Sequence, residues 1–207
     1  TGSTTTAGND NIIIGDQAAN HSTIASDNII IGSNAACRIT TSQQNIIIGS
    51  AAGVAQTTDG QSIIIGHEAG QLYTPGQGIL VGYHAGQLAT GTNTMAIGYR
   101  AGYRFIGNYN TAIGNYAAGS NASIGTGSYN LFVGPYVGYN INTGSRNVIL
   151  GSGDNNFSAG KQLSTGNDNT IVGYLAGKNI AIANDNTLVG SNAGASLTTG
   201  SGNLLLG

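Results

Sequence analysis

A five-residue motif that returns at a nearly constant interval constrains this chain more than any other feature. Its clearest copies, Asn11–Gly15, Asn28–Gly32 and Asn45–Gly49, read Asn-Ile-Ile-Ile-Gly. The closing residue, which we call the repeat glycine, recurs as Gly15, Gly32, Gly49, Gly66, Gly82, Gly98, Gly114, Gly134, Gly151, Gly173, Gly190 and Gly207. Nine of the eleven intervals are 16 or 17 residues long. Such a period predicts a solenoid, in which each unit contacts mainly its neighbours.

The residues before the repeat glycine predict a short β-strand in every copy. The pre-glycine row, from Ile14 to Leu206, is aliphatic throughout, and the strand-start row, from Ile12 to Leu204, is mostly aliphatic. These rows lie two residues apart, so both point to the same face of an extended strand. Because β-branched residues suit a pleated surface, we expect both rows inside an all-β parallel solenoid, or β-roll, of about twelve coils of 16–17 residues. Residues 1–207 are then a single repeat domain, and we expect it to be a segment of a longer fibre.

The middle row lies between these two rows, so we expect it to point outward. It contains no polar residue. A strand that is apolar on both faces is normally buried on both, and a continuous stripe of this kind exceeds what monomers usually expose. The simplest cover is a second copy of the chain in a symmetric oligomer. The expected interface residues are Ile13, Ile30, Ile47, Ile64, Leu80, Phe132, Ile149, Ile171, Leu188 and Leu205.

Two further rows predict how each coil turns. The asparagine row, four residues before the repeat glycine, holds asparagine in nine of twelve copies. Stacked amides at a turn bond one another and the backbone, so a structural ladder is expected. After the repeat glycine come two variable residues and then a small pair such as Ala18-Ala19 or Ala52-Gly53, which permits a sharp bend. A second short strand with one apolar residue, such as Ile39 or Leu72, is expected to follow.

Composition argues against several classes of function. Only 7% of the residues are charged and the net charge is −2, so no stretch is basic enough to follow a nucleic-acid backbone. The apolar runs are too short to cross a bilayer. Cys37 is the only cysteine, which excludes an intrachain disulfide.

The sequence offers little basis for catalysis or metal binding. His21, His67 and His84 lack the spacing of a metal cluster, although a site of His67, Glu68 and His84 is conceivable one coil apart. No serine or threonine lies in a nucleophile elbow. Turns such as Gly8–Asn11 resemble calcium-binding repeats only in part. We therefore expect no enzyme activity, no bound metal and no cofactor.

Tyrosine distribution is the best functional clue. All ten tyrosines follow residue 72, and stacking of the coils should bring three pairs together: Tyr83 with Tyr99, Tyr109 with Tyr129, and Tyr116 with Tyr136. Tyrosine combines a flat apolar ring with a polar tip, which suits recognition of sugars or proteins. Packing along the flank or between chains is the alternative, and the sequence does not decide between them.

The two longest intervals predict protruding loops at residues 120–127 and 153–164, because insertions in solenoids often lie on the binding face. Asn155, Asn156 and Phe157 form the expected tip of the second loop. With the six paired tyrosines, they are the receptor-binding candidates.

The segment Asn110-Thr111-Ala112-Ile113-Gly114-Asn115-Tyr116-Ala117-Ala118 resembles the head repeat of YadA-like trimeric adhesins and the related repeats of bacteriophage tail fibres and tailspikes. Thr199–Gly207 is similar to their linking segment. The resemblance implies a left-handed parallel β-roll, a side-by-side homotrimer and a role in attachment. The chain departs from the family in its Ile-Ile-Ile triplets, in the irregular copies that end at Gly134 and Gly151, and in showing no membrane anchor, coiled-coil stalk or C-terminal chaperone domain.

These observations predict a structural or adhesive fibre segment, such as a phage tail fibre or a cell-surface adhesin head. It would lie outside the cell or on a virion and touch a host glycan or protein. One alternative is a subunit of a self-assembling extracellular filament. An ice-binding solenoid ranks lower because the threonines cluster in turns. A depolymerase needs paired carboxylates across a groove, and the chain has only eight acidic residues, mostly in turns.

Overall fold

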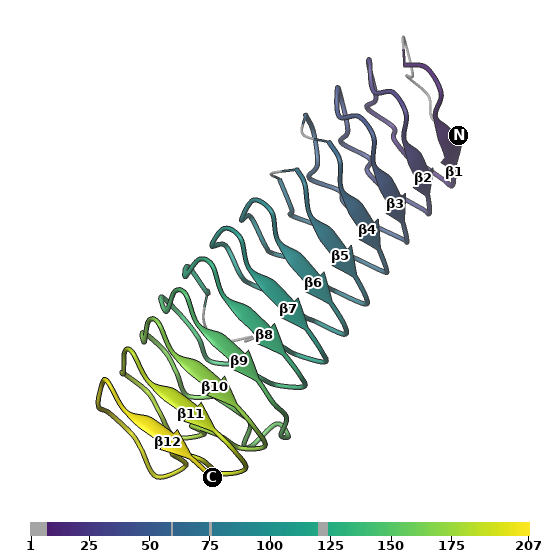
Figure 1. The fold of residues 1–207 in the computed structure, drawn as a ribbon. Coiled ribbons are helices and arrows are strands. Elements are labelled where there is room, and N and C mark those ends of the chain that lie inside the picture. Colours follow the sequence, from purple (N-terminus) through teal and green to yellow (C-terminus); the bar gives the residue numbers. More distant parts are fainter. Residues whose placement is uncertain (1–7, 59, 75, 120–123) are drawn as a thin grey trace.

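The computed structural model describes residues 8–58, 60–74, 76–119 and 124–207 as a parallel β-solenoid of about eleven turns (Figure 1). Each strand is three residues long: β1 Ile12–Ile14, β2 Ile29–Ile31, β3 Ile46–Ile48, β4 Ile63–Ile65, β5 Ile79–Val81, β6 Met95–Ile97, β7 Thr111–Ile113, β8 Leu131–Val133, β9 Val148–Leu150, β10 Thr170–Val172, β11 Thr187–Val189 and β12 Leu204–Leu206. Across the described ranges there is no helix, and hence none that could span a membrane. The predicted all-β fold is confirmed, and so is the short strand before each repeat glycine.

The strands form one sheet in which order in space follows order in sequence. Every neighbouring pair is parallel and in register, so that Ile12 pairs with Ile29 and Ile29 with Ile46. The register holds across the longer intervals as well, where Thr111 pairs with Leu131 and Val148 with Thr170. Equivalent residues of successive coils therefore stack in straight rows along a rod (Figure 1).

The expected assignment of inside and outside is wrong. From Ile30 in β2 to Leu188 in β11, the middle row is at most 3% exposed and forms the core of the solenoid. The pre-glycine and strand-start rows face outward and are half-buried or exposed. The expected interface residues Ile13, Ile30, Ile47, Ile64, Leu80, Phe132, Ile149, Ile171, Leu188 and Leu205 therefore belong to the inward-facing row. An acidic residue at Ile30 or Ile47 would bury an unpaired charge inside the chain, so it would unfold the coil and not separate subunits.

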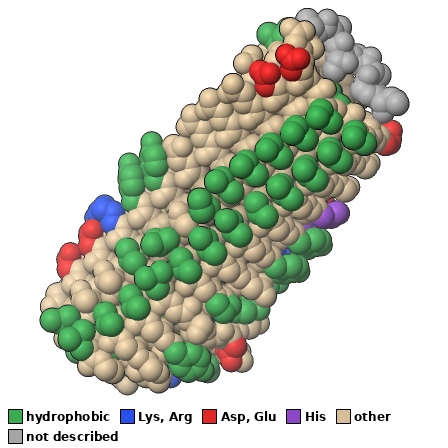
Figure 2. All heavy atoms as spheres, turned by 45° about the vertical axis from the view of Figure 1, so that its right-hand side comes forward, with side chains coloured by type: hydrophobic (Ala, Val, Ile, Leu, Met, Phe, Trp, Pro, Cys, Tyr) green, Lys and Arg blue, Asp and Glu red, His purple; other side chains and the backbone are tan. Residues whose placement is uncertain are grey.

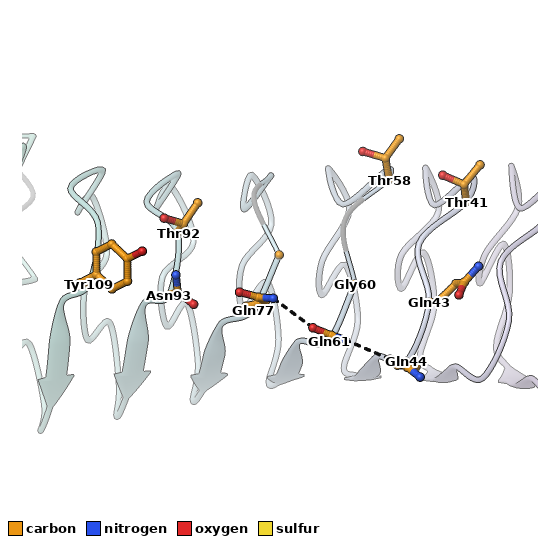
Figure 3. A pocket seen from close by; sticks show the side chains of 11 residues that line it. Thr41, Gln43, Gln44, Thr58, Gly60, Gln61, Gln77, Thr92, Asn93 and Tyr109 are labelled. Carbon is orange, nitrogen blue, oxygen red and sulfur yellow. Dashed lines mark hydrogen bonds between the residues drawn. The ribbon is translucent and has the colours of Figure 1, made fainter.

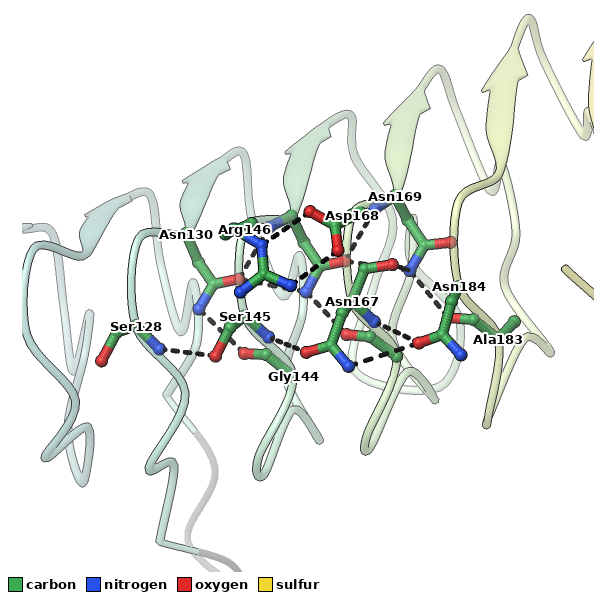
Figure 4. A network of polar contacts seen from close by, with 12 residues as sticks. Ser128, Asn130, Gly144, Ser145, Arg146, Asn167, Asp168, Asn169, Ala183 and Asn184 are labelled. Carbon is green, nitrogen blue, oxygen red and sulfur yellow. Dashed lines mark hydrogen bonds and ion pairs between the residues drawn. The ribbon is translucent and has the colours of Figure 1, made fainter. Parts of the chain in front are cut away.

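The buried asparagine row explains this direction. Asn130, Asn147 and Asn169 are at most 2% exposed. They lie two residues before the middle row, so both rows share one face of the strand. The Oδ1 of Asn147 accepts hydrogen bonds from the backbone N–H of Asn169 (3.0 Å) and from its Nδ2 (2.9 Å). The Nδ2 of Asn147 donates to Gly166 O (2.8 Å) and to Asn130 Oδ1 (3.1 Å). The predicted ladder is confirmed, and it runs inside the coils (Figure 4).

A second polar ladder runs beside the first, two residues earlier in each coil. The backbone N–H of Ser128 donates to Ser145 Oγ (3.0 Å), and that of Ser145 donates to Asn167 Oδ1 (2.9 Å). Between the ladders, the exposed Arg146 forms a two-bond ion pair with Asp168 at 2.7 Å (Figure 4). Hydrogen bonds from Arg146 lower the pKa of the Asp168 carboxyl. An exposed pair of this kind adds little stability, so the two ladders beside it matter more for joining these coils than the ion pair does.

Where the asparagine ladder is interrupted, larger side chains occupy its place. At Ser62 the fully buried Gln56 donates to Asn45 Oδ1 (3.1 Å) and to Ser62 Oγ (3.2 Å). At Gly78 the ring of the fully buried Tyr73 fills the space, since a Cβ on Gly78 would lie 2.5 Å from the Tyr73 hydroxyl oxygen. Tyr73 is therefore a core residue.

The rest of each coil is less regular than the sequence predicts. Ile39 is buried as expected, but Leu72 is 45% exposed, because the inward position seven residues after the repeat glycine belongs to Tyr73 in this coil. In the described residues the expected second strand is reduced to two isolated bridges, Phe105 with Gly125 and Ile182 with Thr199. The small pairs after the repeat glycine are buried, as at Ala18 and Ala19, and make the predicted sharp bend.

Candidate functional site

The outward strand-start and pre-glycine rows together form a continuous apolar surface, which we call the aliphatic face. Figure 2 shows it as rows of hydrophobic side chains along the rod. None of its 24 positions is charged, and the only polar ones are Thr111, Thr170 and Thr187. Most of these side chains are half-buried, because stacked neighbours cover their sides. Every strand contributes to the face, so it is a property of the whole rod and not a local patch.

Aromatic rings line the corner that follows the aliphatic face. His67, Tyr83 and Tyr99 occupy the first-corner row, directly after the repeat glycine, and Tyr116 and Tyr136 occupy the second-corner row, one residue later. We call these five residues the corner ridge. Ring centroids are 5.3 Å apart for His67–Tyr83, 5.2 Å for Tyr83–Tyr99 and 5.1 Å for Tyr116–Tyr136, all stacked. An edge contact of 5.3 Å between Tyr99 and Tyr116 connects the two rows.

The corner ridge combines stacking with a cation. The Cζ atom of Arg100 lies 5.7 Å from the ring centroid of Tyr99 and 5.9 Å from that of Tyr116. The pKa of Tyr116 is raised by burial and also by its hydrogen bond with Tyr99, so its hydroxyl stays protonated at neutral pH. Tyr83 and Tyr99 are 43% and 42% exposed. The ridge therefore offers ligands rigid ring surfaces with polar tips.

The third tyrosine pair lies on the opposite edge of the aliphatic face. Tyr109 and Tyr129 stack at 5.0 Å and are 50% and 61% exposed. They continue a row in which Gln77 Nε2 donates to Gln61 Oε1 (3.0 Å), and Gln61 Nε2 donates to Gln44 Oε1 (3.2 Å). All three predicted stacks are thus confirmed, but they lie on two different edges of the rod.

A shallow polar groove of about 680 Å³ runs along this second edge across several coils (Figure 3). It is lined by Thr41, Gln43, Gln44, Thr58, Gly60, Gln61, Gly76, Gln77, Thr92, Asn93 and Tyr109. The described residues of the lining offer side-chain amides, hydroxyls, glycine backbone and the Tyr109 phenol. Such a surface can hydrogen-bond a polar ligand.

The predicted loop tip at residues 155–157 is exposed, with Phe157 52% accessible. Asp154 organises it, because its Oδ1 accepts the backbone N–H groups of Asn156 and Phe157 (2.8 Å each). These bonds hold the pKa of Asp154 below its ordinary value. Lys161 Nζ donates to the carbonyl oxygens of Asn155 and Asn156. In the other predicted loop, residues 120–123 lie outside the described residues.

The structure brings together three residues that the sequence treats as unclustered. Ligand atoms of His67, Glu68 and His84 all lie within 4.8 Å of one another. The interval from Gly66 to Gly82 is 16 residues, so a sequence separation of 17 places His67 and His84 in adjacent corner rows and not in one row. His21 lies elsewhere, with its Nδ1 2.7 Å from Cys37 O. The repeat phase places the three residues in neighbouring coils, as the sequence allowed, although their linear spacing does not match a metal cluster.

No protein-family model, curated protein or solved structure matches the chain.

Proposed function

We propose that this chain is a structural and adhesive segment of an elongated fibre on a virion or cell surface. Copies associate side by side through the aliphatic face, as a homotrimer, and the corner ridge remains available for attachment to a host glycan or protein. The observation that carries the proposal is an uncharged apolar face that extends over all twelve strands.

A second copy of the chain is the partner that this face fits best. Parallel sheets are normally covered on both faces, and here only the inner face is covered by the chain itself. A partner must match a straight apolar surface whose rows repeat roughly every 4.8 Å. Another copy has that repeat, and symmetric association of identical faces is the usual form of soluble oligomers.

Replacing Ile48 and Ile65 with Asp tests this association. Both are half-buried residues of the pre-glycine row, so the charges would disrupt packing between chains while leaving the interior of each coil intact. We expect the wild type to keep three chain masses at all concentrations in light scattering, and the double variant to become a monomer with an unchanged circular dichroism spectrum. Ser50→Asp, at an exposed corner next to the face, is the control and should remain a trimer.

The alternatives give different masses. A filament would grow with concentration and have no fixed size. A double variant that keeps the wild-type mass would show that the aliphatic face is not the contact between chains.

The corner ridge is tested separately by replacing Tyr99 and Tyr136 with Ala. Tyrosines that anchor an interface commonly contribute more than about 1.4 kcal/mol each, so attachment should weaken at least about tenfold. The melting temperature should change little because these rings lie outside the core. Tyr174→Ala is the matched control, since Tyr174 is 54% exposed in the first-corner row but lies outside the ridge. Intact attachment with a large loss of melting temperature would identify the ridge as packing.

A further inference from the structure

His67, Glu68 and His84 are placed by the backbone stacking of two neighbouring coils. The N–H of His84 donates to the carbonyl oxygen of His67 (3.0 Å), and the N–H of Glu68 donates to that of Ser50 (2.9 Å). These bonds belong to the regular ladder of corner contacts. The three side chains are therefore held at one corner by the fold and do not depend on a mobile loop.

The separations of the ligand atoms are close to those of a metal site. His84 Nε2 lies 3.1 Å from Glu68 Oε2. Two ligands of a tetrahedral zinc ion, each about 2.0–2.1 Å from the metal, lie roughly 3.3 Å apart. His67 completes the set within 4.8 Å, and its side chain is exposed. The rings of His67 and His84 lie side by side, with centroids 5.9 Å apart.

Burial and ring stacking fix the position of the His84 side chain. It is 9% exposed, and its ring stacks on Tyr83 at 3.9 Å. Burial lowers its pKa most, with Arg100 and His67 acting in the same direction and Glu68 opposing them. Among the described residues, the Nδ1 of His84 has no hydrogen-bond partner.

A second layer of side chains orients the carboxylate. Gln87 Nε2 donates to Glu68 Oε2 and to Gln71 Oε1 (3.1 Å). Outer contacts of this type fix the geometry of metal ligands in known sites. Arg100 is a nearby positive charge that opposes a bound cation, but its guanidinium lies over the rings of Tyr103, Tyr99 and Tyr116.

We infer that His67, Glu68 and His84 bind a divalent transition-metal ion such as Zn²⁺, which joins two coils at the first turn of the corner ridge. Two imidazoles and one carboxylate suit zinc, nickel or copper. Calcium and magnesium require more oxygen ligands than this corner provides. The bound ion would fix the His67 ring beside Tyr83 and so extend the rigid part of the ridge.

Titration of the full chain with zinc chloride in a calorimeter tests the inference. We expect one Zn²⁺ per chain and no binding of Ca²⁺. His67→Gln and Glu68→Gln should each weaken zinc binding at least about tenfold, since even changes to supporting residues cost 10–100-fold. The matched control is His21→Gln, which removes an exposed histidine of another corner and should bind zinc like the wild type.

Thermal unfolding gives a second readout, because an ion that binds only the folded chain raises its melting temperature. At one fixed zinc concentration, the rise in melting temperature should be clearly smaller for His67→Gln than for the wild type and His21→Gln. His67 is exposed, so its replacement does not threaten folding, and circular dichroism verifies this. Absence of zinc binding in the wild type, undiminished binding in His67→Gln, or loss of binding in His21→Gln would each overturn the inference.

Discussion

The repeat glycine meets two separate requirements at one position. Gly98 has φ +132°, in a region that side chains rarely adopt, and a Cβ on it would lie 2.6 Å from the carbonyl oxygen of Gly114. Gly32 and Gly173 show the same combination with the glycines of the following coils. The backbone conformation and the close approach of the next coil thus both exclude a side chain. This is the physical reason for the strict spacing that dominates the sequence.

Replacing Gly98 with Ala should lower the free energy of unfolding by about 3 kcal/mol or more, because backbone strain of about 1–3 kcal/mol is joined by a steric clash. Urea denaturation measures the loss. Gly202→Ala is the control: Gly202 has φ +71°, but a Cβ on it would meet nothing within 4 Å, so strain alone should cost about 1–2 kcal/mol. Equal losses in the two variants would mean that the neighbouring coil gives way and that the close approach costs nothing.

At the scale of the structural element, the buried asparagine ladder joins each strand to the next. Each amide is both donor and acceptor, so one asparagine serves three coils. Asn147 bonds with Asn130 on one side and with Asn169 and Gly166 on the other. Losing one residue therefore leaves buried partners unsatisfied in two directions.

Asn147→Ala should lower the free energy of unfolding by about 1–3 kcal/mol for each buried group left without a partner. Urea denaturation again measures this. Asn179→Ala removes an exposed amide that donates to Ala195 O (2.8 Å), so its loss should be below about 1 kcal/mol. A similar loss at both sites would show that burial of the ladder adds nothing to its strength.

The sequence predicts the elements more accurately than their orientation. Strand positions, parallel register, the asparagine ladder and the tyrosine stacks all follow from the repeat phase, because register converts sequence offset into distance along the rod. Alternation along a strand shows which rows share a face but not which face is inside. The asparagine row contained that information, since its amides need partners and it shares a face with the middle row.

Irregular positions were not predictable from the repeat alone. The ring of Tyr73 fills the space beside Gly78 that an asparagine side chain occupies in most other coils. The repeat pattern does not predict this. The expected second strand is reduced to isolated bridges, and its inward residue in the fourth coil is Tyr73, which lies seven residues after the repeat glycine as Ile39 does. His67 and His84 lie in two adjacent corner rows because the interval between their coils is one residue shorter than its predecessors. The position of Tyr73 beside Gly78 and the offset between His67 and His84 both depend on local departures from the repeat. A consensus taken over all copies does not contain such departures.

The whole molecule behaves as a stack of nearly equivalent layers with an apolar exterior face. Contacts join each coil to its two neighbours, so the stability of the rod should be close to a sum over coils and their interfaces. Because the outward rows are apolar in every coil, the number of coils sets the length of the aliphatic face as well as that of the core.

Deleting residues 33–49, one full period, should leave a folded rod that is shorter by about 4.8 Å. Ile30 would then stack on Ile64, and every row would remain in phase. Circular dichroism and small-angle scattering check the fold and the length. Deletion of residues 33–41, about half a period, is the control and should unfold the neighbouring coils because it brings inward and outward rows together. A folded product from the half-period deletion would contradict the layered description.

The side chains of the corner rows are presented at the surface of the rod, whereas the buried middle and asparagine rows stabilise it. The first-corner row contains Asp16, Ser33, His67, Asn115 and Tyr174 on one repeated backbone, and none of them belongs to the core. Side chains of different chemistry thus occupy equivalent positions in successive coils, at a regular spacing along the rod. A new recognition surface can therefore arise by single substitutions at the corners of successive coils. The core of the rod and the axial spacing of its coils stay the same.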